Sequence, residues 1–259
     1  MKITVLGCGP SSGVPLVTGN WGQCDPENPR NYRTRPSIVV EKDGFRVLVD
    51  TSPDLRTQLL RSGIESIDAV LYTHEHADHV MGIDDLRGIW RERGKVIDVF
   101  GPPDVLDLLI NRFSYLFEDA QDRFDLYKPF LAPHRLDGRT FGVGPFESIV
   151  PFEQDHGICM SWGYRFGSFA YSTDVVNLDE NAFEKLAGVD TWIVGCLRNG
   201  APHPTHAHLD KTLSWIERLK VRHAVLTHMN FESDYEVMKA SCPSGVEPGY
   251  DGMVLDVPD

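Results

Sequence analysis

Residues 74–79 concentrate metal-binding side chains, and this cluster constrains the fold more than any other feature of the sequence. The hexapeptide His-Glu-His-Ala-Asp-His holds three of the ten histidines of the chain together with an aspartate. An apolar run at residues 69–72 precedes it and predicts a short buried strand. Imidazole suits Zn, Fe and Ni, and a carboxylate also accepts harder ions. A strand that ends in such a cluster is typical of a metal site.

The spacing within the hexapeptide allows two adjacent ions. His74 and His76 are two residues apart, so on an extended backbone their side chains point the same way. Asp78 and His79 follow a turn and can face a second ion. A solvated loop with chance histidines is the alternative, which the local concentration of histidine disfavours. The zinc-protease motif H-E-x-x-H does not fit, because it requires two histidines four residues apart on one helix.

Three more candidate ligands lie in the second half of the chain. His156, Asp174 and His228 each come shortly after an apolar run that predicts a strand. Alone, each of them is more often a structural residue than a ligand. Together with the hexapeptide they form a set of candidate metal ligands: His74, His76, Asp78, His79, His156, Asp174 and His228. We expect this set to meet at one rim of the fold, where the strands end.

The order of the predicted elements indicates an α+β protein. Strands are predicted at residues 3–6, 37–40, 46–49, 69–72 and 96–100, and again at 147–152, 163–166, 168–171, 192–194, 224–226 and 253–255. Asp43-Gly44 predicts a hairpin turn, and helices are predicted at 54–60, 104–113 and 209–219. The strands fall into two similar halves, which favours two packed sheets with helices outside. We treat residues 1–259 as a single domain.

The segment at residues 102–133 interrupts this pattern with a helical, aromatic-rich insertion. Its aromatic residues are Phe113, Tyr115, Phe117, Phe124, Tyr127 and Phe130. We expect most of these rings to be buried within the insertion itself. The alternative is a lid over the metal site, whose rings would stack on a base or a sugar.

Composition limits the partners and the compartment. With 25 Lys and Arg against 38 Asp and Glu, the net charge is −13, which disfavours a long nucleic acid but allows a small anion at a metal centre. No stretch reaches the roughly 20 apolar residues of a membrane span, and the N-terminal segment does not resemble a signal peptide. The five cysteines include no C-x-x-C pair, which predicts reduced thiols and a cytoplasmic protein.

The H-x-H-x-D-H pattern and the three later ligands resemble the metallo-β-lactamase superfamily. The opening GCGPSSGVP at residues 7–15 and the ending PSGVEPGYDGM at residues 243–253 are similar to its phosphodiesterase branch. Within that branch the chain most resembles the phosphoribosyl cyclic phosphate phosphodiesterases of carbon–phosphorus lyase pathways. The resemblance extends over nearly the whole chain and implies a four-layer αββα sandwich.

The resemblance also implies a role for each candidate ligand. One divalent ion would be held by His74, His76 and His156, a second by Asp78, His79 and His228, and Asp174 would bridge the two. Two Zn or Mn ions roughly 3.5–4 Å apart can activate a shared water as metal-bound hydroxide and bind the phosphate oxygens. The resemblance therefore implies that Asp78 is part of the catalytic machinery.

Further residues are candidates for proton transfer and phosphate binding. His206 aligns with the proton-donor histidine of the family, whereas His203 and His208 are expected to be loop histidines. Arg87 and Arg198 could each bind a phosphate through two hydrogen bonds, although for Arg87 we favour a structural salt bridge. We expect His134 and His223 to have packing or surface roles.

One part of the family pattern is missing. Members of the family that this chain resembles carry a cysteine cluster and a later histidine that bind a separate structural zinc. Here only Cys24 remains, and Phe231 occupies the position of the histidine. A structural zinc site needs four ligands, so we predict no third zinc. We expect Trp21 and Tyr32 to pack inward and hold the loop at residues 18–35.

The sequence therefore predicts a metal-dependent phosphodiesterase that hydrolyses a small nucleotide-like or cyclic sugar phosphate. A tRNA 3′-processing ribonuclease shares the motif, but the net charge of −13 and the lack of a basic arm disfavour it. A lactone or thioester hydrolase, or a non-hydrolytic metal-binding biosynthetic protein, is also compatible with this fold, because fold alone does not fix function. A homodimer is the assembly expected by resemblance.

Overall fold

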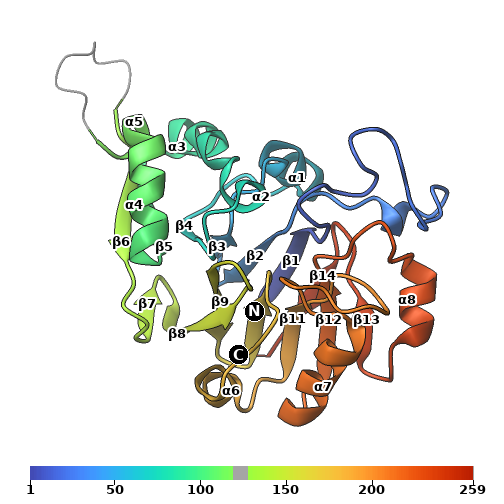
Figure 1. Ribbon diagram of the computed structural model, residues 1–259. Coiled ribbons are helices and arrows are strands. Elements are labelled where there is room, and N and C mark those ends of the chain that lie inside the picture. Colours follow the sequence, from blue (N-terminus) through green and yellow to red (C-terminus); the bar gives the residue numbers. More distant parts are fainter. Residues whose placement is uncertain (119–127, 259) are drawn as a thin grey trace.

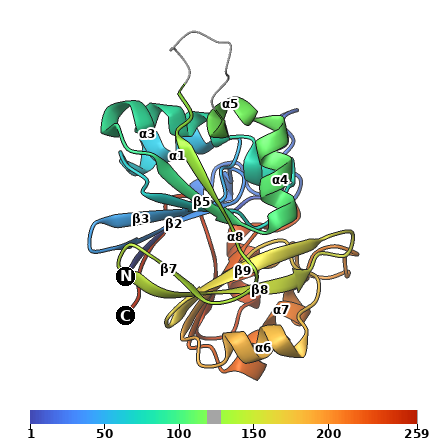
Figure 2. The same ribbon diagram turned by 90° about the vertical axis from the view of Figure 1, so that its left-hand side faces the viewer.

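The fold consists of two stacked sheets, each covered by helices on its outer face. The computed structural model describes residues 1–118 and 128–258. Within this part of the chain each sheet has seven strands. Figure 1 shows how they are arranged. Figure 2 shows the resulting four layers, helices, sheet, sheet and helices. The predicted α+β class and four-layer αββα sandwich are confirmed.

The first sheet comes mainly from the N-terminal half of the chain. In spatial order its strands are β14 (Val254–Asp256), β1 (Lys2–Gly7), β2 (Ser37–Lys42), β3 (Phe45–Val49), β4 (Ala69–Leu71), β5 (Ile97–Gly101) and β6 (Leu131–Arg135). β1 pairs antiparallel with β14 and β2, whereas β3 to β6 run parallel. Asp43 and Gly44 both have positive φ and form the predicted hairpin turn between β2 and β3.

The second sheet comes from the C-terminal half. In spatial order its strands are β13 (Val246–Pro248), β12 (His223–Thr227), β11 (Thr191–Gly195), β10 (Phe169–Ser172), β9 (Met160–Phe166), β8 (Phe146–Asp155) and β7 (Phe141–Val143). β7, β8, β9 and β10 form an antiparallel meander, and β10 to β13 run parallel. Each half therefore contains one block of parallel strands.

Helices on the two outer faces complete the sandwich. The first sheet carries α1 (Leu55–Ser62), α2 (Ala77–Val80), α3 (Leu86–Arg93), α4 (Pro103–Arg112) and α5 (Ser114–Phe117), with the 3-10 turns η1 (Pro29–Asn31) and η2 (Ile83–Asp85) in its loops. The second sheet carries α6 (Glu180–Leu186), α7 (Leu209–Leu219) and α8 (Tyr235–Ser241). Among the described residues, no helix combines the length and apolar character needed to cross a bilayer.

Alternating side chains explain why the first sheet can serve two hydrophobic layers. On β2, Ile38 and Val40 pack between the sheets, while Val39 packs toward the outer helices. On β3, Val49 faces the inner layer and Leu48 the outer one. Successive strand residues point to opposite faces, so a strand buried on both sides needs a continuous apolar run. This is the pattern found in the sequence.

The predicted strands and helices are present, but the sequence missed several short elements. Those not predicted are β6, β7, β13, α2, α3, α5, α6 and α8. The aromatic-rich segment at residues 102–133 contains α4 and α5 and leads into β6, which pairs parallel with β5. Phe130 is fully buried and stacks on Trp90, outside the insertion, and Phe113 and Phe117 pack against the same cluster, whereas Tyr115 is 37% exposed. Phe124 and Tyr127 lie outside the described residues.

The two parallel blocks place several strand ends at one rim. β4 ends just before the hexapeptide, and β12 ends directly before His228. β10 ends two residues before Asp174, and β8 ends directly before His156. Loops at the carboxyl ends of parallel strands are the usual place for ligand-binding groups, because these ends converge on one edge.

Tyr164 provides a test of how the second sheet supports this rim. Its hydroxyl donates a buried 2.6 Å hydrogen bond to the carbonyl of Tyr72, next to the hexapeptide. We expect Tyr164→Phe to lower the free energy of unfolding by about 1–2 kcal/mol, because the carbonyl loses a buried donor. Urea denaturation measures this change. Tyr32→Phe, at a ring that is 44% exposed, is the matched control and should change stability by less than about 0.5 kcal/mol. Equal effects of both substitutions would contradict the prediction.

Candidate metal centre

Three of the candidate site residues leave their strands with an unusual backbone. Asp50 after β3, Asp174 after β10 and His228 after β12 have φ values of 64°, 47° and 61°. Non-glycine residues rarely adopt this left-handed region, and such strain gathers at functional sites. In each case the sharp turn directs a polar side chain toward the rim instead of along the strand.

The first group of donor atoms surrounds one point at this rim. His74 Nε2 lies 3.0 Å from His76 Nδ1, and His156 Nε2 lies 3.3 Å from the same atom. His156 Nε2 is also 3.5 Å from Asp174 Oδ1. Two ligands of a tetrahedral zinc ion are about 3.3 Å apart, given Zn–N distances of about 2.0–2.1 Å. These four side chains are thus spaced like ligands of one ion.

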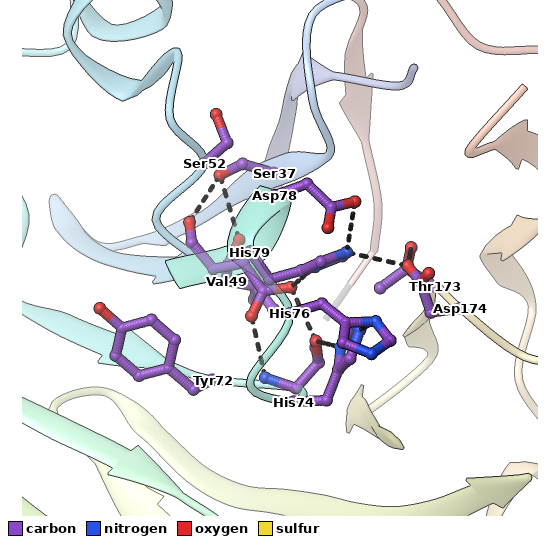
Figure 3. Close-up of polar contacts among 12 residues, drawn as sticks. Ser37, Val49, Ser52, Tyr72, His74, His76, Asp78, His79, Thr173 and Asp174 are labelled. Atoms are coloured by element: carbon purple, nitrogen blue, oxygen red, sulfur yellow. Dashed lines mark hydrogen bonds and ion pairs between the residues drawn. The ribbon is translucent and has the colours of Figure 1, made fainter. Parts of the chain in front are cut away.

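The second group surrounds the other carboxylate oxygen of Asp174, and Figure 3 shows the His79 ring between Asp78 and Asp174. His79 Nε2 is 3.0 Å from Asp174 Oδ2 and 3.3 Å from Asp78 Oδ2. His228 Nε2 is 3.2 Å from Asp174 Oδ2 and 3.7 Å from Asp78 Oδ2. Asp174 therefore presents one oxygen to each group, as a bridging carboxylate does. All seven residues predicted from the sequence come together, and their role as metal ligands stays a proposal.

The donor chemistry fits a pair of divalent ions. His79 Nε2 and both ring nitrogens of His228 are buried and make no hydrogen bond of normal geometry within the described part of the chain. Buried polar atoms are rarely left without a partner, so such atoms indicate a missing group. Imidazole nitrogens and carboxylate oxygens in this number suit zinc or manganese.

Burial and neighbouring charges put His74, His156 and Asp174 in the protonation state that a metal needs. Burial lowers the pKa of His74 well below its usual value and also lowers the pKa of His156. Burial alone would raise the pKa of Asp174, but His228 and His79 outweigh it and hold this pKa well below the usual range. Neutral imidazoles and ionised carboxylates are the forms that bind metal ions.

His79 is the exception, because its pKa is raised. Burial would lower this pKa, but the carboxylates of Asp78, Asp174 and Asp50 outweigh burial. Three buried carboxylates therefore attract a positive charge to this position in the absence of an ion. A metal ion bound by His79 would supply that charge in place of the proton.

Asp50 is a site residue that the sequence pattern did not reveal. Its Oδ2 lies 2.6 Å from His79 Nδ1, so His79 donates from Nδ1 and leaves Nε2 directed at the ligand group. Asp50 also accepts hydrogen bonds from the backbone and the hydroxyl of Thr73. A carboxylate behind a metal-binding histidine fixes its orientation and its tautomer. The sequence offered one signal for Asp50, which was its position directly after a predicted strand. His228 likewise comes shortly after a predicted strand.

Comparison with protein families assigns the chain to a superfamily. The model of the beta-lactamase superfamily domain matches residues 45–229 of the chain. The chain belongs to the beta-lactamase superfamily. The predicted resemblance is confirmed, and so is the prediction of an enzyme of this superfamily at the level of the family.

Relatives within the superfamily differ in their described activities. A crystal structure described as a new diphosphatase from the PhnP family is 35% identical, covers 98% of this chain and 96% of its own, and has a TM-score of 0.89. An octanoyltransferase of Porphyromonas gingivalis is 33% identical over 98% of this chain and 51% of its own length. A ribonuclease Z of Bradyrhizobium is 33% identical over 54% of this chain and 46% of its own. The chain thus spans about half the length of these curated relatives.

His206 lies beside both ligand groups. Its Nδ1 is 3.7 Å from Asp174 Oδ1, and its ring stacks on His228 with centroids 4.6 Å apart. Gly157 has φ 84°, and a Cβ there would come within 2.5 Å of the carbonyl of Pro204, so only glycine lets this loop approach so closely. His206 could also reach an ion shared with Asp174 and His228. Its predicted role as proton donor is untested by this geometry alone.

The remaining candidate residues occupy more peripheral positions. His203 lies on the far side of His206, with ring centroids 5.3 Å apart. Arg87 pairs with Asp84 and packs over the rings of Tyr115 and Phe130, which agrees with the structural role we favoured. Three more each contact one acidic side chain: Arg198 forms an ion pair with Glu232, and His134 and His223 form hydrogen bonds with Asp98 and Glu247. His208 is the residue directly before α7.

The corner between the loop at residues 18–35 and the segment after His228 is organised around Arg33. This fully buried guanidinium donates to the carbonyls of Ser233 at 2.7 Å and Asn230 at 3.3 Å, and it lies 3.9 Å from the Cys24 thiol. The expected inward packing of Tyr32 is wrong, because that ring is 44% exposed. A buried arginine thus ties the loop at residues 18–35 to the segment that follows His228. The prediction of no third zinc stays a prediction.

The Asp50–His79 pair generates a prediction about metal affinity. We expect Asp50→Asn to weaken metal binding by about 10–100-fold, because His79 loses the carboxylate that fixes its orientation and tautomer. Competition with a chromogenic chelator measures the affinity. Asp98→Asn is the matched control, since Asp98 pairs with His134 at 2.7 Å on the exposed surface, far from any ligand group in sequence. Unchanged affinity in Asp50→Asn would show that this contact does not support the site.

Proposed function

We propose that the protein is a metal-dependent phosphodiesterase that acts on a small nucleotide-like or cyclic sugar phosphate. The observation that carries this proposal is the Asp174 carboxylate, whose two oxygens face two separate sets of histidine and aspartate donors. Two neighbouring Zn or Mn ions fit this donor set. The PhnP-family diphosphatase, which matches along nearly the whole chain, supports chemistry on a phosphate group.

Each group of donors would bind one of the two ions. His74, His76 and His156 would hold one ion, Asp78, His79 and His228 the other, and Asp174 would join them. When bound, such a pair of ions lowers the pKa of water and offsets charge on the phosphate. Asp50 and the carbonyl of Thr205 would orient His79 and His156 through their second ring nitrogens. In the neutral form of each ring, these contacts place the proton on the outer nitrogen and aim the other nitrogen inward.

His206 would transfer a proton to the leaving oxygen. Burial, together with the nearby His228, lowers the pKa of His206 to about 3, so the ring is neutral in the free protein. An anionic phosphate beside the ring would raise this pKa, because a negative neighbour favours the charged imidazolium. Substrate binding would therefore favour the protonated form of His206, which can donate its proton to the leaving oxygen.

A second candidate function is hydrolysis of a diphosphate linkage. The relative with 35% identity and a TM-score of 0.89 is described as a diphosphatase. The same donor set could bind either a phosphodiester or a phosphoanhydride, since both present anionic oxygens around phosphorus. The choice between the two depends on the groups that bind the rest of the substrate.

Further reactions are less well supported. The ribonuclease Z relatives match only part of the chain, and the net charge of −13 is unfavourable for a tRNA substrate. A lactone or thioester hydrolase and a non-hydrolytic biosynthetic protein are the weaker candidates. We propose a cytoplasmic location, which agrees with five unpaired cysteines, and a homodimer on the basis of resemblance.

A substrate panel separates these functions. The metal-loaded protein is incubated with bis-para-nitrophenyl phosphate, a cyclic ribose phosphate, a nucleoside diphosphate sugar, a precursor tRNA and a lactone. We expect turnover of the small phosphodiesters, or of the diphosphate if the second candidate is correct, and none of the precursor tRNA or the lactone. An Asp174→Ala variant controls for contaminating activity, because it lacks the bridging carboxylate. Activity confined to the tRNA or to the lactone would reject the proposal.

Replacement of His206 tests its role separately from metal binding. We expect His206→Ala to lower kcat by about 10²–10⁴-fold, the usual contribution of a general acid, while metal content stays equal to that of the wild type. His203→Ala, in the same loop, should lower kcat far less. Kinetics on an activated phosphodiester and elemental analysis provide the two measurements. If His206→Ala loses metal, His206 is a ligand and the proton-donor assignment fails.

A further inference from the structure

A second crevice lies on the first sheet, away from the proposed metal centre. It has a volume of about 480 Å³ and runs between α1, β1 and the segment just before β14. None of the seven candidate ligands lines it. Small-molecule sites usually enclose about 300–1,000 Å³, so this crevice is large enough for one small ligand.

Two basic side chains and an aromatic ring line the exposed part of the crevice, which we call its mouth. Lys2 and Arg61 line it and are exposed, and within the described residues neither has an acidic partner at ion-pair distance. The Arg61 guanidinium lies 5.3 Å from the centre of the half-exposed Tyr32 ring. Arg46, which also lines the crevice, pairs with Glu41 at 2.6 Å. Two exposed cations in the lining of one crevice favour an anionic group in it.

The interior of the crevice is lined by polar groups of a different kind. Asp251, Thr34, Gln58 and Thr4 are all buried or nearly buried and line its wall. Asp251 accepts hydrogen bonds from the backbone of Thr34 at 2.7 Å and from its hydroxyl at 2.6 Å. Carboxylate, hydroxyl and amide groups at the base of a pocket suit a ligand that carries hydroxyls. A phosphorylated sugar combines such hydroxyls with an anion.

Hydrogen bonds connect the floor of the crevice to the loop of one metal-site residue. Asp251 Oδ1 accepts from the backbone of Cys8 at 3.1 Å. The carbonyl of Cys8 in turn accepts from the backbone of Met229, at 3.0 Å. Met229 directly follows His228 in the chain. The opening motif at residues 7–15 and the ending motif at residues 243–253 therefore meet at Asp251, between the crevice and His228.

A second path leads from the floor toward His79. Gln58 donates to the Thr34 hydroxyl at 2.8 Å and accepts from the Ser52 hydroxyl at 2.9 Å. Thr51, the neighbour of Ser52, donates from its backbone to the carbonyl of His79 at 2.7 Å. Both paths consist of buried or partly buried hydrogen bonds, whose geometry is tightly constrained by packing.

We propose that this crevice is a second ligand site, which binds a phosphorylated sugar, free or as part of a nucleotide, and which is coupled to the metal centre. The phosphate lies at the mouth between Lys2 and Arg61, and the sugar hydroxyls face Asp251 and Thr34. Occupancy shifts the loops of His228 and His79 through the two hydrogen-bonded paths. Binding at the crevice does not depend on the proposed function, whereas the coupling rests on it.

Binding is tested by isothermal titration calorimetry on the metal-loaded full chain. The probes are ribose 5-phosphate, adenosine monophosphate and inorganic phosphate. We expect Arg61→Gln and Lys2→Gln each to raise the dissociation constant of one class of binding site about tenfold or more. Each substitution removes a charge-assisted contact with the phosphate. Arg56→Gln is the matched control, because Arg56 lies on the same helix but outside the crevice. This substitution should leave every class of site unchanged.

The outcomes separate binding from coupling. Equal affinities in Arg61→Gln and Arg56→Gln would overturn the site, and inorganic phosphate binding as tightly as ribose 5-phosphate would overturn the sugar assignment. For coupling, kcat on an activated phosphodiester is measured with and without ribose 5-phosphate. We expect a change in kcat in the wild type and in Arg56→Gln that is lost in Arg61→Gln. If ribose 5-phosphate changes kcat equally in the wild type, Arg56→Gln and Arg61→Gln, or changes it in none of them, the coupling is overturned.

Discussion

The rest of the site depends on the interaction of the buried Asp174 carboxylate with the histidines around it. It is buried where a lone charge would be costly, and it is held ionised by histidines from both halves of the chain. One oxygen faces a group from the first half together with His156, and the other faces His79 and His228. Neither sheet could complete this arrangement alone, so the site forms only when the two sheets are packed against each other.

Burying this polar cluster costs free energy. The apolar layers on both sides of the first sheet offset that cost. Strands β2, β3 and β4 direct alternate residues into the two layers, which fixes their register. With register fixed, the ends of the strands have fixed positions, and so do the residues that follow them. The left-handed turns at Asp50, Asp174 and His228 are then tolerated, because the surrounding packing determines the backbone.

Much of this could be predicted from the sequence, for reasons that particular residues make clear. The apolar runs fix the longer strands, and the ligands follow those runs directly. Asp50 was missed because a single carboxylate after a strand has no motif of its own. The fastening of the loop at residues 18–35 was also predicted wrongly, because an arginine is rarely buried and only the folded chain brings the carbonyls of Asn230 and Ser233 around Arg33. Short elements such as β7 and β13 contain too few residues to show a period.

The guanidinium of Arg33 has a consequence for how the protein responds to its surroundings. This positive charge is covalently part of the chain, so a chelator that strips metal ions from a protein cannot remove it. The loop at residues 18–35 therefore stays tied to the segment after His228 whether or not ions occupy the candidate ligands, and the two regions respond independently to metal supply.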